Sequence, residues 1–231
     1  MIIALDGPAG AGKSTVARRI ASQLGLAFLD TGAMYRAVTL AVLERGVDPS
    51  DEEACARVAR ALQLDFDTEG SIRIDGRPGE PDIRTRTVTR NVSAVSAHPA
   101  VREAIVAEQR DLAARAGGVV AEGRDTTTVV FPEADHKFFL NASSLERARR
   151  RAAQEGRPEA LDEIHADIKL RDRLDSTRAT APLIQAPDAV RIDADSHGVD
   201  EVVAAILEVV RQREAASRDP GRSADSTEAR P

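Results

Sequence analysis

The sequence predicts an α/β fold in which a parallel five-stranded sheet is flanked by helices. Two observations support this prediction. Short apolar runs of strand length alternate with longer segments whose apolar residues recur at helical spacing, and this order is typical of parallel sheets covered by helices on both faces. A glycine-rich loop separates the first apolar run from the first helix. With 231 residues, we expect one domain with inserts.

The composition is that of an ordinary soluble globular protein, with 42% hydrophobic and 30% charged residues. A formal net charge of −6 argues against a general nucleic-acid-binding protein, which usually carries a basic face. Cys55 is the single cysteine, which excludes an intramolecular disulfide, and nothing indicates secretion. No apolar run approaches the ~20 residues of a membrane span, and the first strand leaves no room for a signal peptide. We therefore expect a cytoplasmic protein with no membrane or nucleic-acid partner.

The first element is a strand at residues 2–5, and a helix with Val16, Ile20 and Leu24 on one face follows the loop. The loop fits the phosphate-binding pattern G-x-x-x-x-G-K-[ST] at every fixed position. Lys13 can reach the β- and γ-phosphates of ATP, and the Ser14 hydroxyl can bind Mg²⁺. Backbone N–H groups and a helix N-terminus complete such a site. The residues expected to hold the nucleotide are Gly7, Pro8, Ala9, Gly10, Ala11, Gly12, Lys13, Ser14 and Thr15.

A second strand and two helices come next. Residues 26–29 form the strand, and residues 30–32 provide the turn and cap at which a helix begins. Ser50 or Asp51 caps another helix.

The next part of the chain has the pattern of a small insert on the core sheet. Residues 64–66 and 71–75 alternate in polarity on either side of a turn, which predicts an antiparallel hairpin. Residues 76–81 are expected to be loop, and residues 83–97 to be helical. The insert is therefore placed at about 64–98.

The remaining elements complete the sheet. Pro99 opens a long helix. Ser143 or Ser144 caps a helix that Gly156 and Pro158 interrupt, and an amphipathic helix ends the domain. Further strands are expected at residues 119–121, 137–140 and 189–192. The folded domain is expected to span 1–213. Residues 214–231 lack a periodic apolar face, so this tail is expected to be disordered.

Ligands of parallel sheets bind at the carboxyl ends of the strands. The phosphate loop, residues 30–32 and residues 122–125 all follow strands, so they should meet at one crevice. The loop alone does not separate kinases from GTPases and motors. The N-K-x-D motif of guanine-specific GTPases is missing, and D-x-x-G occurs only in turns, at 67–70 and 195–198. A small-molecule phosphotransferase remains the best prediction.

Several further motifs resemble those of bacterial cytidylate kinases, in the same order along the chain. They are Asp30-Thr31-Gly32-Ala33-Met34-Tyr35-Arg36, Glu122-Gly123-Arg124-Asp125 leading to Thr128-Val129-Val130-Phe131-Pro132, and Ile168-Lys169-Leu170-Arg171-Asp172 leading to Asp175, Arg178 and Ala181-Pro182-Leu183. The resemblance implies a nucleoside-monophosphate kinase fold with a monophosphate-binding insert and a short lid, at about 154–180. It implies ATP-dependent phosphorylation of CMP and dCMP by a monomer.

The resemblance also implies roles for individual residues. Arg36, Arg124 and Arg178 match arginines that bind the acceptor phosphate, and a guanidinium can grip phosphate oxygens bidentately. Asp175 matches a ribose-hydroxyl acceptor, with Arg171 beside it. The cytosine edge would be read by Ser93, Arg102 and Asp125. Cytosine offers an exocyclic amine donor, which requires an acceptor such as the carboxylate of Asp125.

Other interpretations of these residues stay open at this point. Arg36 could lie on an exposed helix face, Thr31 could cap its helix rather than contact substrate, and Asp125 could cap a turn. The arginine run 147–151 fits either a solvated helix face or an anion site. The chain could also be another small-molecule kinase or a non-catalytic nucleotide-binding regulator.

Overall fold

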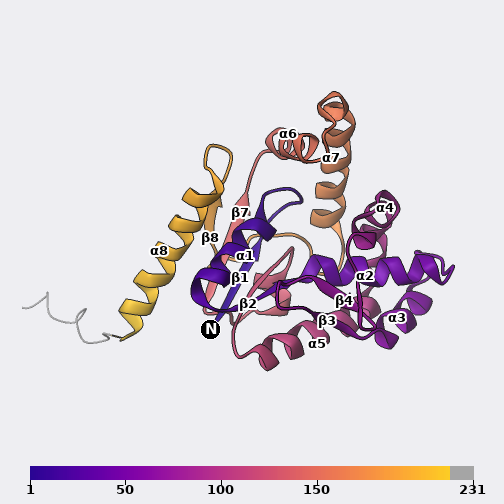
Figure 1. Cartoon of the computed structure of the whole chain (residues 1–231), viewed down its shortest axis with the longest axis horizontal. Helices are drawn as coiled ribbons and strands as arrows, with labels where there is room; N and C mark the ends of the chain where they lie inside the picture. The colour runs from indigo at the N-terminus through magenta and orange to yellow at the C-terminus, as the bar shows by residue number, and fades with distance from the viewer. Residues whose placement is uncertain (219–231) are drawn as a thin grey trace, which may run out of the picture.

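A computed structural model describes residues 1–218 of the 231-residue chain (Figure 1). Its core is a parallel five-stranded sheet with the strand order β2-β6-β1-β7-β8, so the predicted α/β fold is confirmed. Every strand end lies within two residues of its predicted position. The strands are β1 (Ile2–Asp6), β2 (Ala27–Asp30), β6 (Val119–Gly123), β7 (His136–Asn141) and β8 (Val190–Asp193).

Strand β6, which lies between β2 and β1, is buried on both faces, which explains its apolar start at Val119–Ala121. Val119 and Ala121 belong to one apolar cluster, and Val120 belongs to another. Successive residues of a strand point to opposite faces of the sheet, so the sheet separates two hydrophobic cores.

Helices cover both of these cores. The core around Val119 and Ala121 is completed by α2 (Thr31–Glu44), α3 (Glu52–Ala61) and α5 (Pro99–Ala116). The core around Val120 is completed by α1 (Lys13–Leu24) and α8 (Val199–Arg218). Figure 1 shows α8 on one side of the sheet and α2 and α3 on the other.

Capping side chains set the beginnings of several helices, as the sequence predicts. The Asp30 carboxylate accepts a hydrogen bond from the Ala33 N–H at 2.8 Å and caps α2. Asp51, and not Ser50, caps α3. Pro99 is the first residue of α5, where its missing N–H costs nothing.

The insert contains a small antiparallel sheet, in the order β3-β4-β5. The predicted hairpin is present as β3 (Leu64–Phe66) and β4 (Ile72–Ile74). The prediction of loop at 76–81 is partly wrong, because β5 (Arg77–Pro78) pairs with β4 there. The single helix predicted at 83–97 is also wrong, since a 3₁₀ turn (Asp82–Arg84) is followed by extended Thr85 and then by α4 (Arg86–Val95).

A helical hairpin stands beyond the carboxyl edge of the sheet (Figure 1). It consists of α6 (Ser144–Gln154), a 3₁₀ turn (Pro158–Ala160) and α7 (Leu161–Thr177). The hairpin has an apolar cluster of its own, which shares no residue with either sheet core. This cluster consists of Ala148, Ala152, Ala160, Ile164 and Ile168, with Leu161 packed against it.

The last helix, α8, continues to Arg218 and so includes residues 214–218, which the sequence assigned to a disordered tail. Glu214 explains part of this extension, because its carboxylate lies 3.1 Å from Nε2 of the buried His136 in β7. The rest of the predicted tail, 219–231, lies outside the described residues. Among residues 1–218, no helix has both the length and the apolar character needed to cross a membrane.

Candidate active site

A cavity of about 590 Å³ opens at the carboxyl ends of β1, β2 and β6. The phosphate loop lines one end of it, and residues of α4, α5 and α7 line the other. Every site residue predicted from the sequence lines this cavity except Gly7 and Pro8, which lie at the start of the loop. The predicted convergence of three strand ends on one crevice is therefore present in the structure.

The phosphate loop depends on glycine at two of its fixed positions. A Cβ atom on Gly7 would lie 2.0 Å from the carbonyl oxygen of Leu140 in β7, so no larger residue fits there. Gly12 adopts φ 94° and sits at the start of α1 without a capping side chain. The first N–H groups of α1 are therefore free to face an anion.

Lys13 is buried at the centre of the site. Its Nζ donates a hydrogen bond to the carbonyl oxygen of Pro8 at 2.9 Å and lies 3.9 Å from Oε2 of Glu122. Burial, reinforced by the positive charge of Arg124, lowers the pKa of Lys13 to about 7, although Glu122 opposes this shift. A phosphate group beside Lys13 would restore its charge.

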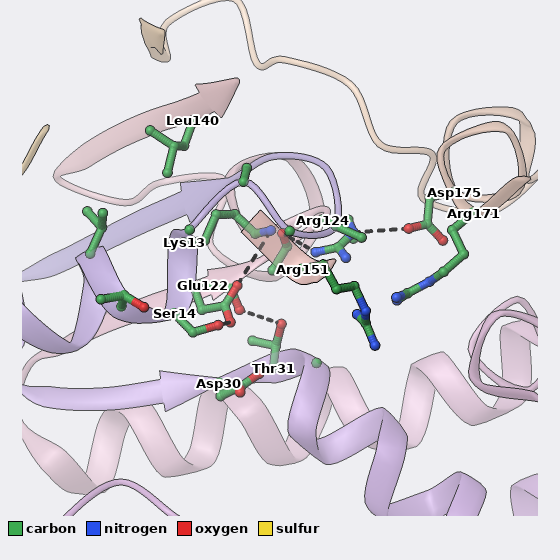
Figure 2. A pocket seen from close by; sticks show the side chains of 18 of the residues that line it. Lys13, Ser14, Asp30, Thr31, Glu122, Arg124, Leu140, Arg151, Arg171 and Asp175 are labelled. Atoms are coloured by element: carbon green, nitrogen blue, oxygen red, sulfur yellow. Dashed lines mark hydrogen bonds and ion pairs between the residues drawn. The ribbon is translucent and has the colours of Figure 1, made fainter. Parts of the chain in front are cut away.

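Ser14 and Glu122 together present oxygen atoms beside Lys13 (Figure 2). The Ser14 hydroxyl donates to Oε1 of Glu122 at 2.5 Å. Burial and the neighbouring Asp30 raise the pKa of Glu122, and Lys13 and Ser14 partly offset this effect. Residues 1–218 contain no cluster of three or more acidic, histidine or cysteine side chains suited to a metal. Two oxygen-bearing side chains nevertheless suit Mg²⁺, which takes few protein ligands and fills its shell with phosphates and water.

Arginines dominate the other end of the cavity. Arg36 is buried, so the alternative of an exposed helix face is wrong, and its guanidinium donates to the Ile83 carbonyl at 3.1 Å and the Thr89 hydroxyl at 2.9 Å. Burial and the nearby Arg171 lower the pKa of Arg36 to about 9. Burial and Arg124 lower the pKa of Arg171 to about 10. Crowding of like charges is a cost that a bound anion would remove.

Arg171 has an additional sign of a missing partner. Its Nε atom is buried and makes no hydrogen bond within residues 1–218. Figure 2 shows the guanidinium groups of Arg124, Arg151 and Arg171 directed towards one another across the cavity. Buried polar groups are normally paired, so this arrangement fits an anionic ligand.

Arg124 differs from these arginines because carboxylates surround it. Its Nε donates to Oδ2 of the buried Asp175 at 3.0 Å. Burial alone would lower the pKa of Arg124, but Asp175 and Glu122 reverse the sign, and the pKa is raised. Arg124 therefore links the donor end of the cavity to α7.

Asp125 is buried between two arginines. Its carboxylate accepts from Arg102 Nη2 and lies 3.4 Å from Nη2 of Arg178. Arg102 itself packs over the ring of Tyr35 at 5.2 Å. Burial raises the pKa of Asp125, and Arg102 and Arg178 counteract this by favouring the ionised form. The side chain caps no turn, so that alternative is wrong.

A second buried carboxylate fixes the backbone next to Asp125. Asp6, the last residue of β1, accepts from the N–H and hydroxyl groups of Thr126 and Thr127 at 2.6–2.9 Å. These residues begin a π-helical turn, Thr126–Val130, that the sequence did not predict. Asp6 thus joins the strand before the phosphate loop to the segment carrying Asp125.

Comparison with known proteins identifies the family. A family model described as "Cytidylate kinase" matches residues 3–212. The chain belongs to the cytidylate kinase family. Among curated relatives, the cytidylate kinase of Rhodococcus opacus is 48% identical over 219 residues, covering 92% of this chain and 96% of that protein. Those of Limosilactobacillus reuteri and Solibacter usitatus are each 46% identical, covering 91% and 95% of this chain and 95% and 96% of theirs.

Membership of a kinase family makes the chain an ATP-using kinase. The sequence motifs assigned no role to Glu122 or to Arg147, although both lie at the site. Glu122 belongs to one of the family-like motifs, and its position at the end of the strand beside β1 is the signal that could have revealed its role. Arg147 was one member of an arginine run, and its burial against the phosphate loop had no local signal.

The structure also settles two open interpretations in this family member. Thr31 does not cap α2, because Asp30 does, and the Thr31 hydroxyl donates to the Glu122 carbonyl oxygen at 2.7 Å. The arginine run 147–151 fits neither interpretation as a whole, since Arg147 is buried and Arg149 is exposed. Ser93 lines the acceptor end of the cavity from α4.

We predict that nucleotide binding takes up a proton. Lys13 must be charged to bind phosphate, its pKa in the free protein is about 7, and bound phosphates raise it. The number of protons taken up per MgADP bound should therefore increase as the pH rises above about 7. Over the same range the affinity for MgADP should fall by up to about tenfold per pH unit. Calorimetry with MgADP at about pH 8, in two buffers of different ionisation enthalpy, measures the uptake. Equal binding enthalpies in the two buffers would contradict it.

Proposed function

We propose that the chain transfers the γ-phosphoryl group of ATP to CMP and dCMP, giving CDP and dCDP with ADP. The observation that carries this proposal is the buried Asp125 carboxylate, held between Arg102 and Arg178 at the acceptor end of the cavity. Cytosine presents an exocyclic amine that a carboxylate can accept. Uracil presents a carbonyl oxygen at the same place, which would face the carboxylate without a hydrogen bond. Rejection of such a mismatch in a buried site is strong.

The donor half of the mechanism rests on the phosphate loop. Backbone N–H groups at the start of α1 and the Lys13 ammonium would bind the β- and γ-phosphates. Ser14 and Glu122 would hold Mg²⁺, which would supply positive charge to offset the negative charge of the phosphates. The chain's own contribution is to orient these phosphates towards the acceptor end.

The acceptor half rests on arginine. Arg36, Arg171 and Arg178 would grip the phosphate of the monophosphate, and Arg124 would contact it from the donor side. Their charges also stabilise the charge that develops during in-line transfer. The acceptor oxygen is already anionic, so the reaction needs no general base.

Asp175 would accept hydrogen bonds from the ribose. Arg124 engages its Oδ2 atom, and within residues 1–218 no side chain bonds to Oδ1. That oxygen is free for a ribose hydroxyl. We further propose that the insert at about 64–98 and the lid at about 154–180 close over the substrates, because an open site would allow hydrolysis of ATP. We also propose that the protein acts as a monomer.

The test is an assay of purified protein with ATP, Mg²⁺ and a panel of acceptors. CMP and dCMP should react faster than UMP, AMP, GMP and shikimate, with CDP or dCDP as the product. Equal or faster turnover with any of the other acceptors would overturn the proposal. Binding of ATP without transfer to any acceptor would instead favour a regulator.

A further inference from the structure

Arg147 joins two parts of the site that are far apart in the sequence. This α6 side chain is only 4% exposed. Its Nη1 donates to the carbonyl oxygen of Ala9 in the phosphate loop at 2.9 Å. The same guanidinium makes a two-pronged contact with Asp172 of α7, at 3.0 Å and 2.6 Å, while its Nε donates to the Ala142 carbonyl at 2.9 Å.

The phosphate loop also packs against the stem of this arginine. A Cβ atom on Gly10 would lie 3.4 Å from the Cβ of Arg147. The loop is therefore seated on Arg147 through both a hydrogen bond and close contact. Four hydrogen bonds leave the guanidinium a single fixed orientation.

Asp172 occupies a critical place on α7. It follows Arg171 directly and precedes Asp175 by one helical turn. Asp175 in turn pairs with Arg124, and Arg178 follows at the end of the helix. A displacement of Asp172 would thus move the acceptor-binding residues of α7 together.

We propose that Arg147 and Asp172 form a positioning pair that aligns the acceptor-binding residues of α7 with the phosphate loop. Neither residue of the pair lines the cavity. The effect of the pair on transfer rests on the proposed function. Its chemistry requires arginine, because a planar guanidinium can reach the Ala9 carbonyl and both Asp172 oxygens at once. A lysine ammonium is a point charge and cannot span all three.

The decisive variant is Asp172→Asn. It leaves the bonds from Arg147 to Ala9 and Ala142 in place, so the KM for ATP should stay within about threefold of wild type. Misplacement of α7 should lower kcat with CMP by about 10- to 100-fold, since errors near 1 Å have effects of this size. Asp167→Asn is the matched control, because it removes an exposed carboxylate from the same helix and should leave kcat unchanged.

A double-mutant cycle tests whether the two residues act as a unit. Arg147→Met combined with Asp172→Asn should be no slower than Arg147→Met alone. Compared with Arg147→Met, Arg147→Lys should have a higher melting temperature but no higher kcat. Effects that multiply in the double variant, or a kcat that returns with stability in Arg147→Lys, would show a merely structural role and overturn the proposal.

Hydrogen exchange gives a readout that does not depend on turnover. MgADP should slow exchange in the last two turns of α7 in wild type, and this protection should be lost in Asp172→Asn while the phosphate loop stays protected. If MgADP slowed exchange in the phosphate loop of the wild-type protein but left exchange in α7 unchanged, the proposed pairing would be overturned. A wild-type protein that shows the α7 response but no transfer to CMP would instead overturn the proposed function.

Discussion

Lys13→Met should lower kcat with CMP by at least about 10³-fold while the fold stays intact. Methionine matches the length and apolar stem of lysine but cannot bind phosphate. Lys13 is 5% exposed and its Nζ lies beside the buried Glu122 carboxylate, so Lys13→Met leaves that carboxylate without its cation and should also lower the melting temperature; kcat is therefore measured at a temperature where the variant is folded. A coupled assay of ADP formation, together with a thermal melt, measures both effects.

Lys137 provides a control of the same chemistry. Its Nζ pairs with Asp188 at 2.6 Å, and it does not line the cavity. Lys137→Met should leave kcat unchanged. If Lys13→Met retained more than about a tenth of wild-type kcat, the lysine would not act on the transferred phosphate.

The second large effect is expected at Asp125. Asp125→Asn should lower kcat/KM for CMP by on the order of 10³-fold, because one of the two acceptor oxygens becomes a donor and two arginines lose their carboxylate. Activity with UMP should fall far less, since the amide can donate to the uracil carbonyl. The KM for ATP should change by no more than about threefold.

Steady-state kinetics with CMP, dCMP and UMP at several ATP concentrations measure this selectivity. A thermal melt is needed beside them, because a broken buried ion pair also lowers stability. If the KM for CMP and the KM for ATP rose equally, or if kcat/KM fell equally for CMP and UMP, Asp125 would not take part in base recognition.

Much of the architecture could be predicted because its causes are local. The strands are buried runs, the helices have caps such as Asp51 and Pro99, and the loop needs Gly7 where β7 approaches within contact distance. The family motifs around Lys13 and Asp125 then pointed to the residues that the cavity brings together.

The rest depends on contacts between distant segments. Arg147 and Arg149 have similar neighbours in sequence, yet one is buried under the phosphate loop and the other is solvated. Thr85 breaks a segment whose apolar spacing is helical on both sides. The π-helical turn at Thr126–Val130 begins at residues bonded to Asp6, 120 residues away in the chain. No local pattern contains this information.

The separate apolar cluster of the α6–α7 hairpin has a consequence for the local opening motions of the molecule. Its members pack among themselves, and the polar bonds of Arg147 are among its attachments to the phosphate loop. Water can replace hydrogen bonds at modest net cost, whereas exposing an apolar core is expensive. The hairpin should therefore move away from the sheet without unfolding, and its amides should exchange with solvent by an opening that leaves the sheet undisturbed. By the same reasoning, related chains could vary the length of this hairpin without having to repack either sheet core.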